Sequence, residues 1–163
     1  MDVMSLEKVA LSTLRFLFTE YKRGPSVVYH IQGIARKYNV DPLELSNYLL
    51  ENSWIRECWA FSNDNVACKI TVSGIEQVDP LYVRERLVRI LGIIADAGGS
   101  KPLLEILEFK IEDFSIALDL VNQLETLGLA KIYNPDRTII VAITDAGYRY
   151  YEKKGKHLMA LMA

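Results

Sequence analysis

The spacing of apolar residues in the first half of the chain predicts a series of helices. Leu14, Leu17, Phe18 and Tyr21 recur at intervals of three and four, which places their side chains on one face of a helix. The Gly-Pro step at 24–25 should end that helix, because neither residue favours helical continuation. We therefore expect an amphipathic first helix with a buried apolar face.

Two further helices and a β-hairpin are expected next. A second helix should cover roughly residues 27–38. A third should begin at Asp41, where Asp-Pro-Leu-Glu supplies an N-cap, a first-turn proline and a capping-box glutamate. Residues 54–61 and 66–72 are rich in β-branched and aromatic side chains, and the Ser-Asn-Asp-Asn stretch between them is typical of a turn. These two segments should pair as a hairpin.

The second half of the chain repeats this order. An apolar helical stripe comes first, followed by a break at glycines 98–99, a helix from about Lys101, and a longer helix over residues 112–127 that a glycine should end. A second hairpin should form from residues 129–133 and 138–143 around an Asn-Pro-Asp-Arg turn. The stripe consists of Leu87, Ile90, Leu91 and Ile94.

A short motif after each hairpin marks the repeat. Residues 70–74 read Ile-Thr-Val-Ser-Gly, and residues 143–147, which lie 73 positions later, read Ile-Thr-Asp-Ala-Gly. A repeated supersecondary unit of this kind indicates two copies of one small fold. We therefore expect two domains, residues 1–79 and 80–163, in a mainly α-helical fold with small β-hairpins, that is, an α+β class.

Residues 33–49 resemble the helix-turn-helix of the winged-helix superfamily. Residues 124–129, Leu-Glu-Thr-Leu-Gly-Leu, are similar to the usual exit from the third helix of such domains into the wing. Ile-Thr-x-x-Gly is similar to the step by which the last wing strand of many such regulators enters a C-terminal helix. The first copy departs from this pattern, because Trp54 stands where the Gly-Leu exit is usual. The resemblance covers nearly the whole chain and implies two tandem winged-helix domains.

The two helices that this resemblance would place against DNA carry no Lys or Arg. They are the segments 41–52 and 112–127, and together they hold seven acidic side chains. Cationic contacts with phosphates dominate DNA binding, so these helices would bring carboxylates towards a polyanion. The seven acids are Asp41, Glu44, Glu51, Glu112, Asp113, Asp119 and Glu125.

Helical periodicity divides each of these helices into an inward and an outward face. In the first, Leu43 and Leu50 either pack under the wing or form an apolar face for a protein partner. In the second, Asn122 has the chemistry to pair with adenine, but the nearby Asp119 argues against base readout and favours a solvated acidic face. The expected recognition-helix face comprises Leu43, Glu44, Asn47, Leu50, Ser115, Asp119 and Asn122.

Basic side chains lie outside these two helices. They occur at the end of the first helix, on the second helix and its counterpart, in the second hairpin turn and near the C-terminus. Helix-two ends and wing tips are where phosphate contacts occur in winged-helix proteins, although scattered solubilising charges fit the same residues. The candidate phosphate contacts are Lys22, Arg23, Arg36, Lys37, Lys101, Arg137, Lys153, Lys154 and Lys156.

The first helix of each half has apolar residues on more than one face. A helix of a small domain needs one apolar face, so the surplus predicts packing between the domains or between two copies of the chain. We expect a homodimer on this basis. The surplus residues are Val9, Phe16, Tyr82 and Ile93.

Composition excludes several classes of protein. Half of the 163 residues are hydrophobic and the net charge is −2, so the chain should be globular but has no overall positive field for nucleic acid. No apolar run is long enough to span a membrane, and the N-terminus lacks a signal-peptide pattern. We therefore expect a cytoplasmic protein with no membrane partner.

Residues suited to catalysis or cofactor binding are few. His30 and His157 have no metal-spaced partner and no glycine-rich phosphate loop is present, so we expect neither an enzyme nor a bound metal or cofactor. Cys58 and Cys68 are too few for a disulfide framework. With a four-residue hairpin loop, they should lie on opposite faces of the hairpin and should not bond.

Two functions remain. One is a dimeric, DNA-binding transcriptional regulator that touches double-stranded DNA through its wings and helix-two ends, as the resemblance implies. The other is a tandem winged-helix scaffold that binds a protein partner and not DNA, as such domains do in membrane-remodelling and chromosome-condensation complexes. The superfamily favours DNA, whereas the two acidic helices favour the scaffold.

Overall fold

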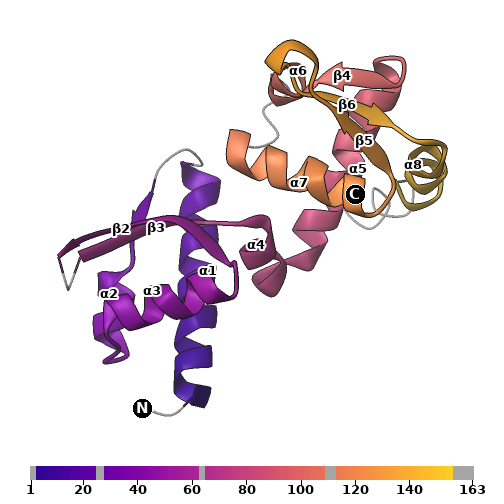
Figure 1. The fold of residues 1–163 in the computed structure, drawn as a ribbon. Helices are drawn as coiled ribbons and strands as arrows, with labels where there is room; N and C mark the ends of the chain where they lie inside the picture. Colours follow the sequence, from indigo (N-terminus) through magenta and orange to yellow (C-terminus); the bar gives the residue numbers. More distant parts are fainter. Residues whose placement is uncertain (1–2, 25–27, 63–64, 109–112, 156–163) are drawn as a thin grey trace. The chain divides into compact units, whose positions relative to one another are not determined.

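The chain folds as two compact units, Met1–Pro80 (unit 1) and Leu81–Ala163 (unit 2), each with its own three-stranded antiparallel sheet (Figure 1). The protein is mainly α-helical with small sheets, which is the α+β class that the sequence predicts. The computed structural model describes residues 3–24, 28–62, 65–108 and 113–155.

Unit 1 is built around the strand β3. That strand lies between β1 and β2 and is antiparallel to both. The elements of the unit, in chain order, are α1 (Val3–Arg23), β1 (Tyr29–His30), α2 (Gln32–Lys37), α3 (Pro42–Glu51), β2 (Ile55–Ser62), β3 (Asn65–Ile70) and α4 (Val72–Val78).

Unit 2 has the same order of helices and strands, and its central strand is β6. Its elements are α5 (Pro80–Asp96), β4 (Ser100–Pro102), α6 (Leu103–Leu107), α7 (Phe114–Thr126), β5 (Ala130–Tyr133), β6 (Ile140–Ile143) and α8 (Asp145–Tyr150). A 3-10 turn (Pro135–Arg137) separates β5 from β6, and a π-helical turn (Tyr151–Gly155) follows α8. Both halves therefore share one topology within their described residues.

Helix α1 is buried over a wide face. Four elements of unit 1, α2, α3, α4 and β3, pack against it. As a result Val9, only 3% exposed, lies in the core together with the predicted stripe, whereas Phe16 is half-buried. The expectation that Val9 offers surface to a second copy is therefore wrong, because neighbouring elements of the same chain cover that side. The buried stripe consists of Leu14, Leu17, Phe18 and Tyr21.

Each sheet contains a short strand where the apolar pattern predicts the start of a helix. The second helix was expected from residue 27 and its counterpart from Lys101, but strands β1 and β4 come first. Tyr29 pairs with Cys68, and Lys101 pairs with Val141. Pairing with the central strand makes these segments β-strands. Their sequence does not predict this, since two or three residues are too few to show an alternating pattern.

The repeated Ile-Thr-x-x-Gly motif joins the last strand of each sheet to the following helix. In unit 1 the Thr71 hydroxyl accepts a hydrogen bond from the Gly74 amide (3.1 Å) and donates one to the Ser53 carbonyl (2.7 Å). One side chain thus caps α4 and ties it to the turn that precedes β2. A Cβ atom at Gly74 would collide with the Trp54 carbonyl oxygen, so only glycine fits there.

Unit 2 makes the same set of contacts. The Thr144 hydroxyl accepts from the Gly147 amide (3.0 Å) and donates to the Gly128 carbonyl (2.7 Å). Gly147 in turn lies against the Leu129 carbonyl, where a Cβ atom would collide with that oxygen. The Ile-Thr-x-x-Gly motif therefore makes the same hydrogen-bonded connection in both units. This connection is called the joint below.

The third helix of each unit ends through a residue in the left-handed conformation. After α7 this residue is Gly128, with φ of 75°. After α3 it is Ser53, with φ of 61°, and Trp54 follows it as Leu129 follows Gly128. The first copy thus keeps the backbone geometry of the Gly-Leu exit with Ser-Trp. A side chain in this conformation costs about 1–2 kcal/mol.

Candidate functional site

Helix α3 presents a mixed acidic and apolar face. The Asp41 carboxylate caps the helix by accepting a hydrogen bond from the Leu43 amide (3.4 Å), and Pro42 occupies the first turn. Leu45 and Leu49 are fully buried against the rest of unit 1. No Lys or Arg occurs in this helix, so its exposed face has no cation for a phosphate. The exposed side chains are Glu44, Asn47, Leu50 and Glu51.

Leu50 distinguishes between the two interpretations of this face. A leucine packed under the hairpin would be buried, but Leu50 is 40% exposed. It lies beside Asn47 and Glu51 on the solvent side of α3, while Leu43 is half-buried. The outer face of α3 therefore combines carboxylates with an exposed aliphatic side chain.

Helix α7 begins at Phe114, directly after its N-cap residue Asp113. The Asp113 carboxylate accepts a hydrogen bond from the Ile116 amide (3.0 Å), which sets the first helical residue at Phe114. Glu112, expected as the start of this helix, lies outside the described residues. The inner face of α7 consists of Ile116, Ala117, Leu120, Val121 and Leu124, all buried.

The predicted outer face of α7 is only partly available to a partner. Asn122 is exposed, whereas Ser115 and Asp119 are half-buried. The Glu125 carboxylate accepts a hydrogen bond from the Ile132 amide of β5 (2.8 Å), so it holds the hairpin against the helix. The acidic character predicted for this helix is present, but the carboxylates of Asp113 and Glu125 already have structural roles.

Unit 2 exposes several large apolar side chains near this helix. Leu104 on α6 is 68% exposed, and α6 packs against α7. Phe114 at the start of α7 is 46% exposed, and Leu127 just after its end is 55% exposed. These three side chains give the α6–α7 region an apolar component that the sequence pattern did not single out.

The basic residues at the end of α1 are partly occupied by contacts within unit 1. Lys22 and Arg23 are both exposed. The Lys22 ammonium lies 4.4 Å from the centre of the Phe18 ring, and the Arg23 guanidinium lies 3.4 Å from the Glu20 carboxylate. Such exposed contacts are weak, so both side chains could still turn to another anion.

Arg36 and Lys37 form an exposed basic pair in the last turn of α2. The Lys37 ammonium lies 5.4 Å from the centre of the exposed Tyr38 ring. This pair lies at the end of the second helix, the position that the winged-helix resemblance assigns to phosphate contacts.

The basic candidates of unit 2 lie on three separate elements. Lys101 is half-buried in β4. Arg137 is exposed in the turn between β5 and β6, with φ of 65°. Lys153 and Lys154 are exposed in the π-helical turn, and Lys156 lies outside the described residues. The structure therefore does not gather these cations on one element.

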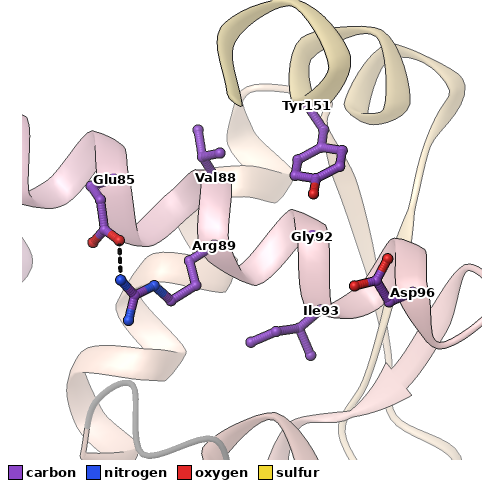
Figure 2. Close-up of a pocket in the computed structure, with 7 residues that line it drawn as sticks. All are labelled: Glu85, Val88, Arg89, Gly92, Ile93, Asp96 and Tyr151. Atoms are coloured by element: carbon purple, nitrogen blue, oxygen red, sulfur yellow. Dashed lines mark ion pairs between the residues drawn. The ribbon is translucent and has the colours of Figure 1, made fainter. Parts of the chain in front are cut away.

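A small pocket opens along α5 and is closed on one side by Tyr151 (Figure 2). The Tyr151 ring lies against Gly92, where a Cβ atom would come within 2.9 Å of it. The volume is about 230 Å³, which is below the roughly 300–1,000 Å³ of small-molecule sites, so the pocket does not suggest an ordinary ligand site. Its lining residues are Glu85, Val88, Arg89, Gly92, Ile93, Asp96 and Tyr151.

One residue that lines this pocket, Glu85, carries a buried carboxylate. Glu85 is 4% exposed and pairs with Arg89 (2.5 Å) and Arg86 (3.4 Å). The Arg86 guanidinium also lies 4.7 Å from the centre of the Tyr82 ring, and burial raises the pKa of Tyr82. Tyr82 and Ile93, two of the residues predicted at a dimer contact, are both half-buried.

The two cysteines lie together on the β2–β3 hairpin, contrary to the sequence prediction. The register of β2 against β3 shifts by one residue between Arg56 and Trp59, so Glu57 and Cys58 both oppose Cys68. The thiols of Cys58 and Cys68 are hydrogen-bonded. The prediction of opposite faces is wrong because it assumed a regular register from the turn, whereas the register shifts between Ala60 and Ser62 and again at this β-bulge.

Comparison with known proteins assigns no family to the chain. No family model matches it, and no curated protein shows significant similarity to it. Within the described ranges, no three His, Cys, Asp or Glu side chains are grouped so that they could hold a metal ion. Among the same residues, no helix has the length and apolar character needed to cross a membrane.

Proposed function

We propose that this chain is a non-enzymatic tandem winged-helix protein that binds a protein partner through the outer face of α3, with α7 as its counterpart in unit 2. Support for the fold comes from the element order of both units, in which three helices and a short strand precede a hairpin that completes the sheet. The repeated joint at Thr71 and Thr144 is further support, because it places the same closing helix after each hairpin.

The exposure of Leu50 carries the proposal for a protein partner. A DNA-reading helix places cations and amides against phosphates and bases, but α3 offers no cation, one exposed amide (Asn47), two exposed carboxylates and an exposed leucine. Burying a leucine side chain contributes about 1.5–3 kcal/mol, and the carboxylates beside it favour a partner that carries Lys or Arg. The proposed partner is therefore a protein segment that carries both basic and apolar side chains.

Selection from a random-peptide display library on the immobilised full-length chain tests this proposal. Enriched peptides should combine Lys or Arg with large apolar residues, and they should lose most of their affinity for Leu50→Ala and for the double reversal Glu44→Lys/Glu51→Lys. Glu7→Lys, an exposed reversal on α1, is the matched control and should bind as the wild type does. Selected peptides that bind the α3 variants unchanged, or no enrichment at all, would count against the proposal.

DNA binding is the second candidate, and the exposed pair Arg36 and Lys37 favours it. Together with Arg137 they lie on elements that contact phosphates in winged-helix proteins. Because α3 and α7 would repel the backbone, such binding would be shallow, largely non-specific and weak. Few phosphates would be neutralised, so affinity would fall away at modest salt. Reversal of both charges, Arg36→Glu/Lys37→Glu, should abolish it, whereas Asp119→Ala should not weaken it.

A further inference from the structure

The β-bulge in the β2–β3 hairpin brings the chain's two cysteines into contact. Directly opposed residues of antiparallel strands have Cα atoms roughly 4.5–5.5 Å apart, which falls inside the span of about 4.4–6.8 Å that a disulfide bridges. Cys58 and Glu57 share the position opposite Cys68 across the bulge, and the thiols of Cys58 and Cys68 are hydrogen-bonded. A covalent bond between the two sulfurs therefore needs little movement of the backbone.

The two thiols differ in access to solvent. Cys68 is fully buried in β3, where Tyr29 of β1 flanks it on the other side. Cys58 is half-buried on β2, an edge strand of the sheet. A reagent from solvent therefore reaches Cys58 first, and Cys68 is reached only through Cys58.

The hydrogen bond between the thiols also shifts their pKa values in opposite directions. It holds the pKa of Cys58 below its usual value, against the opposing effect of burial. The same hydrogen bond and burial both raise the pKa of Cys68. Since the thiolate is the nucleophile in thiol–disulfide exchange, Cys58 is the more reactive of the two at neutral pH.

We propose that Cys58 and Cys68 are a redox-active pair that forms a reversible intrachain disulfide by exchange with a small-molecule disulfide. In the first step the Cys58 thiolate attacks one sulfur of that disulfide, forms a mixed disulfide and releases the other half as a thiolate. In the second step Cys68 loses its proton and attacks the Cys58 sulfur, releasing the second half. The two cysteines are oxidised by two electrons, and the small disulfide is reduced to two thiols.

The oxidised state would fix the register of the hairpin. The bond would link β2 to β3 at the bulge, where Glu57 has φ of 52° and its carboxylate lies 3.4 Å from the Lys69 ammonium. The exchange depends on the geometry of the hairpin alone. It is independent of what the outer face of α3 binds.

Glutathione disulfide added to the reduced, folded, full-length chain tests the proposal. After free thiols are blocked with N-ethylmaleimide, intact mass spectrometry should show a product that has lost two hydrogens and carries neither glutathione nor maleimide. A wild-type product that keeps glutathione, or a folded chain whose two thiols both stay unoxidised, would overturn the proposal.

Two single variants separate the roles of the cysteines. Cys68→Ser should accumulate a stable glutathione adduct at Cys58, because no resolving thiol is present. Cys58→Ser should stay unmodified while folded, and equal reactivity of this variant and the wild type would contradict the assigned order. The wild type gives a check that needs no variant, since maleimide should label one thiol quickly in buffer and both in concentrated urea. Rapid labelling of both thiols in the folded protein would also contradict it.

Discussion

Gly74 lies so close to the backbone carbonyl of Trp54 that no side chain fits between them. The same relationship links Gly147 to the carbonyl of Leu129 in unit 2. In both units this contact brings the closing helix against the turn that leaves the third helix. The glycine of the Ile-Thr-x-x-Gly motif is therefore a packing requirement, and its recurrence reflects one joint built twice.

Alanine at either glycine should destabilise its unit. Gly74→Ala and Gly147→Ala each force a methyl group against a backbone oxygen, so the free energy of unfolding should fall by about 1–3 kcal/mol. Urea denaturation followed by circular dichroism measures this change. Gly33→Ala is the control, because nothing lies within 4 Å of a Cβ atom there, and better helix propensity should leave stability equal or up to about 1 kcal/mol higher. Equal losses in all three variants would contradict this account of the motif.

The residue that follows each third helix in the left-handed conformation is Ser53 in unit 1 and Gly128 in unit 2. Replacing each with the residue found in the other unit should have opposite effects on stability. Ser53 and Gly128 both adopt the left-handed conformation, which only glycine adopts without strain. Ser53→Gly should therefore raise the free energy of unfolding by about 1 kcal/mol, and Gly128→Ser should lower it by a similar amount. Thermal and urea unfolding of the two variants measure both changes. Loss of stability in Ser53→Gly would show that the serine side chain does more for the turn than the strain costs.

The helices and hairpins of this fold could be predicted because their signals are local. The stripe of α1, the Asp41 cap of α3 and the Thr71 cap of α4 each depend on residues a few positions apart. Strands β1 and β4 could not be predicted, since they are defined only by pairing with a distant central strand. A repeat of the whole unit was visible because the joint needs the same residue types in both copies.

The candidate site was only partly visible in the sequence. The acidic character of α3 follows directly from its residues, but the exposure of Leu50 depends on where the hairpin lies. The contact between Cys58 and Cys68 depends on two register shifts in the hairpin, one of them a bulge at Glu57, a residue whose left-handed conformation no glycine marks. The burial of Val9 likewise reflects packing by four elements and not the pattern of α1 itself.

The reactivity of Cys58 should depend on pH in a defined direction. Its pKa is lowered by the hydrogen bond from Cys68, so the midpoint of its alkylation rate should lie at lower pH than that of an ordinary cysteine. In Cys68→Ala the hydrogen bond is gone, and burial alone should move the midpoint upward. The rate of reaction with iodoacetamide across the pH range measures both. A midpoint unchanged in Cys68→Ala would remove the assigned cause.

The chain is expected to form a homodimer. Phe16, Tyr82 and Ile93 are only half-buried in the single chain, and Ile93 lines the pocket along α5. Sedimentation equilibrium at micromolar concentration should report about twice the monomer mass. Ile93→Glu should shift the equilibrium towards the monomer, because a charge at an apolar contact opposes burial. A wild type that sediments as a monomer would refute the homodimer.

Titration of the chain onto a random-sequence DNA duplex, followed by fluorescence anisotropy from low to physiological salt, tests the central claim most directly. The acidic outer face of α3 predicts no binding, or weak binding that disappears as salt rises. Glu44→Lys/Glu51→Lys, which replaces that charge with cations, should bind the duplex more tightly than the wild type. Tight binding that persists at physiological salt, discriminates between sequences and is lost in Asn47→Ala or Asn122→Ala would contradict the claim.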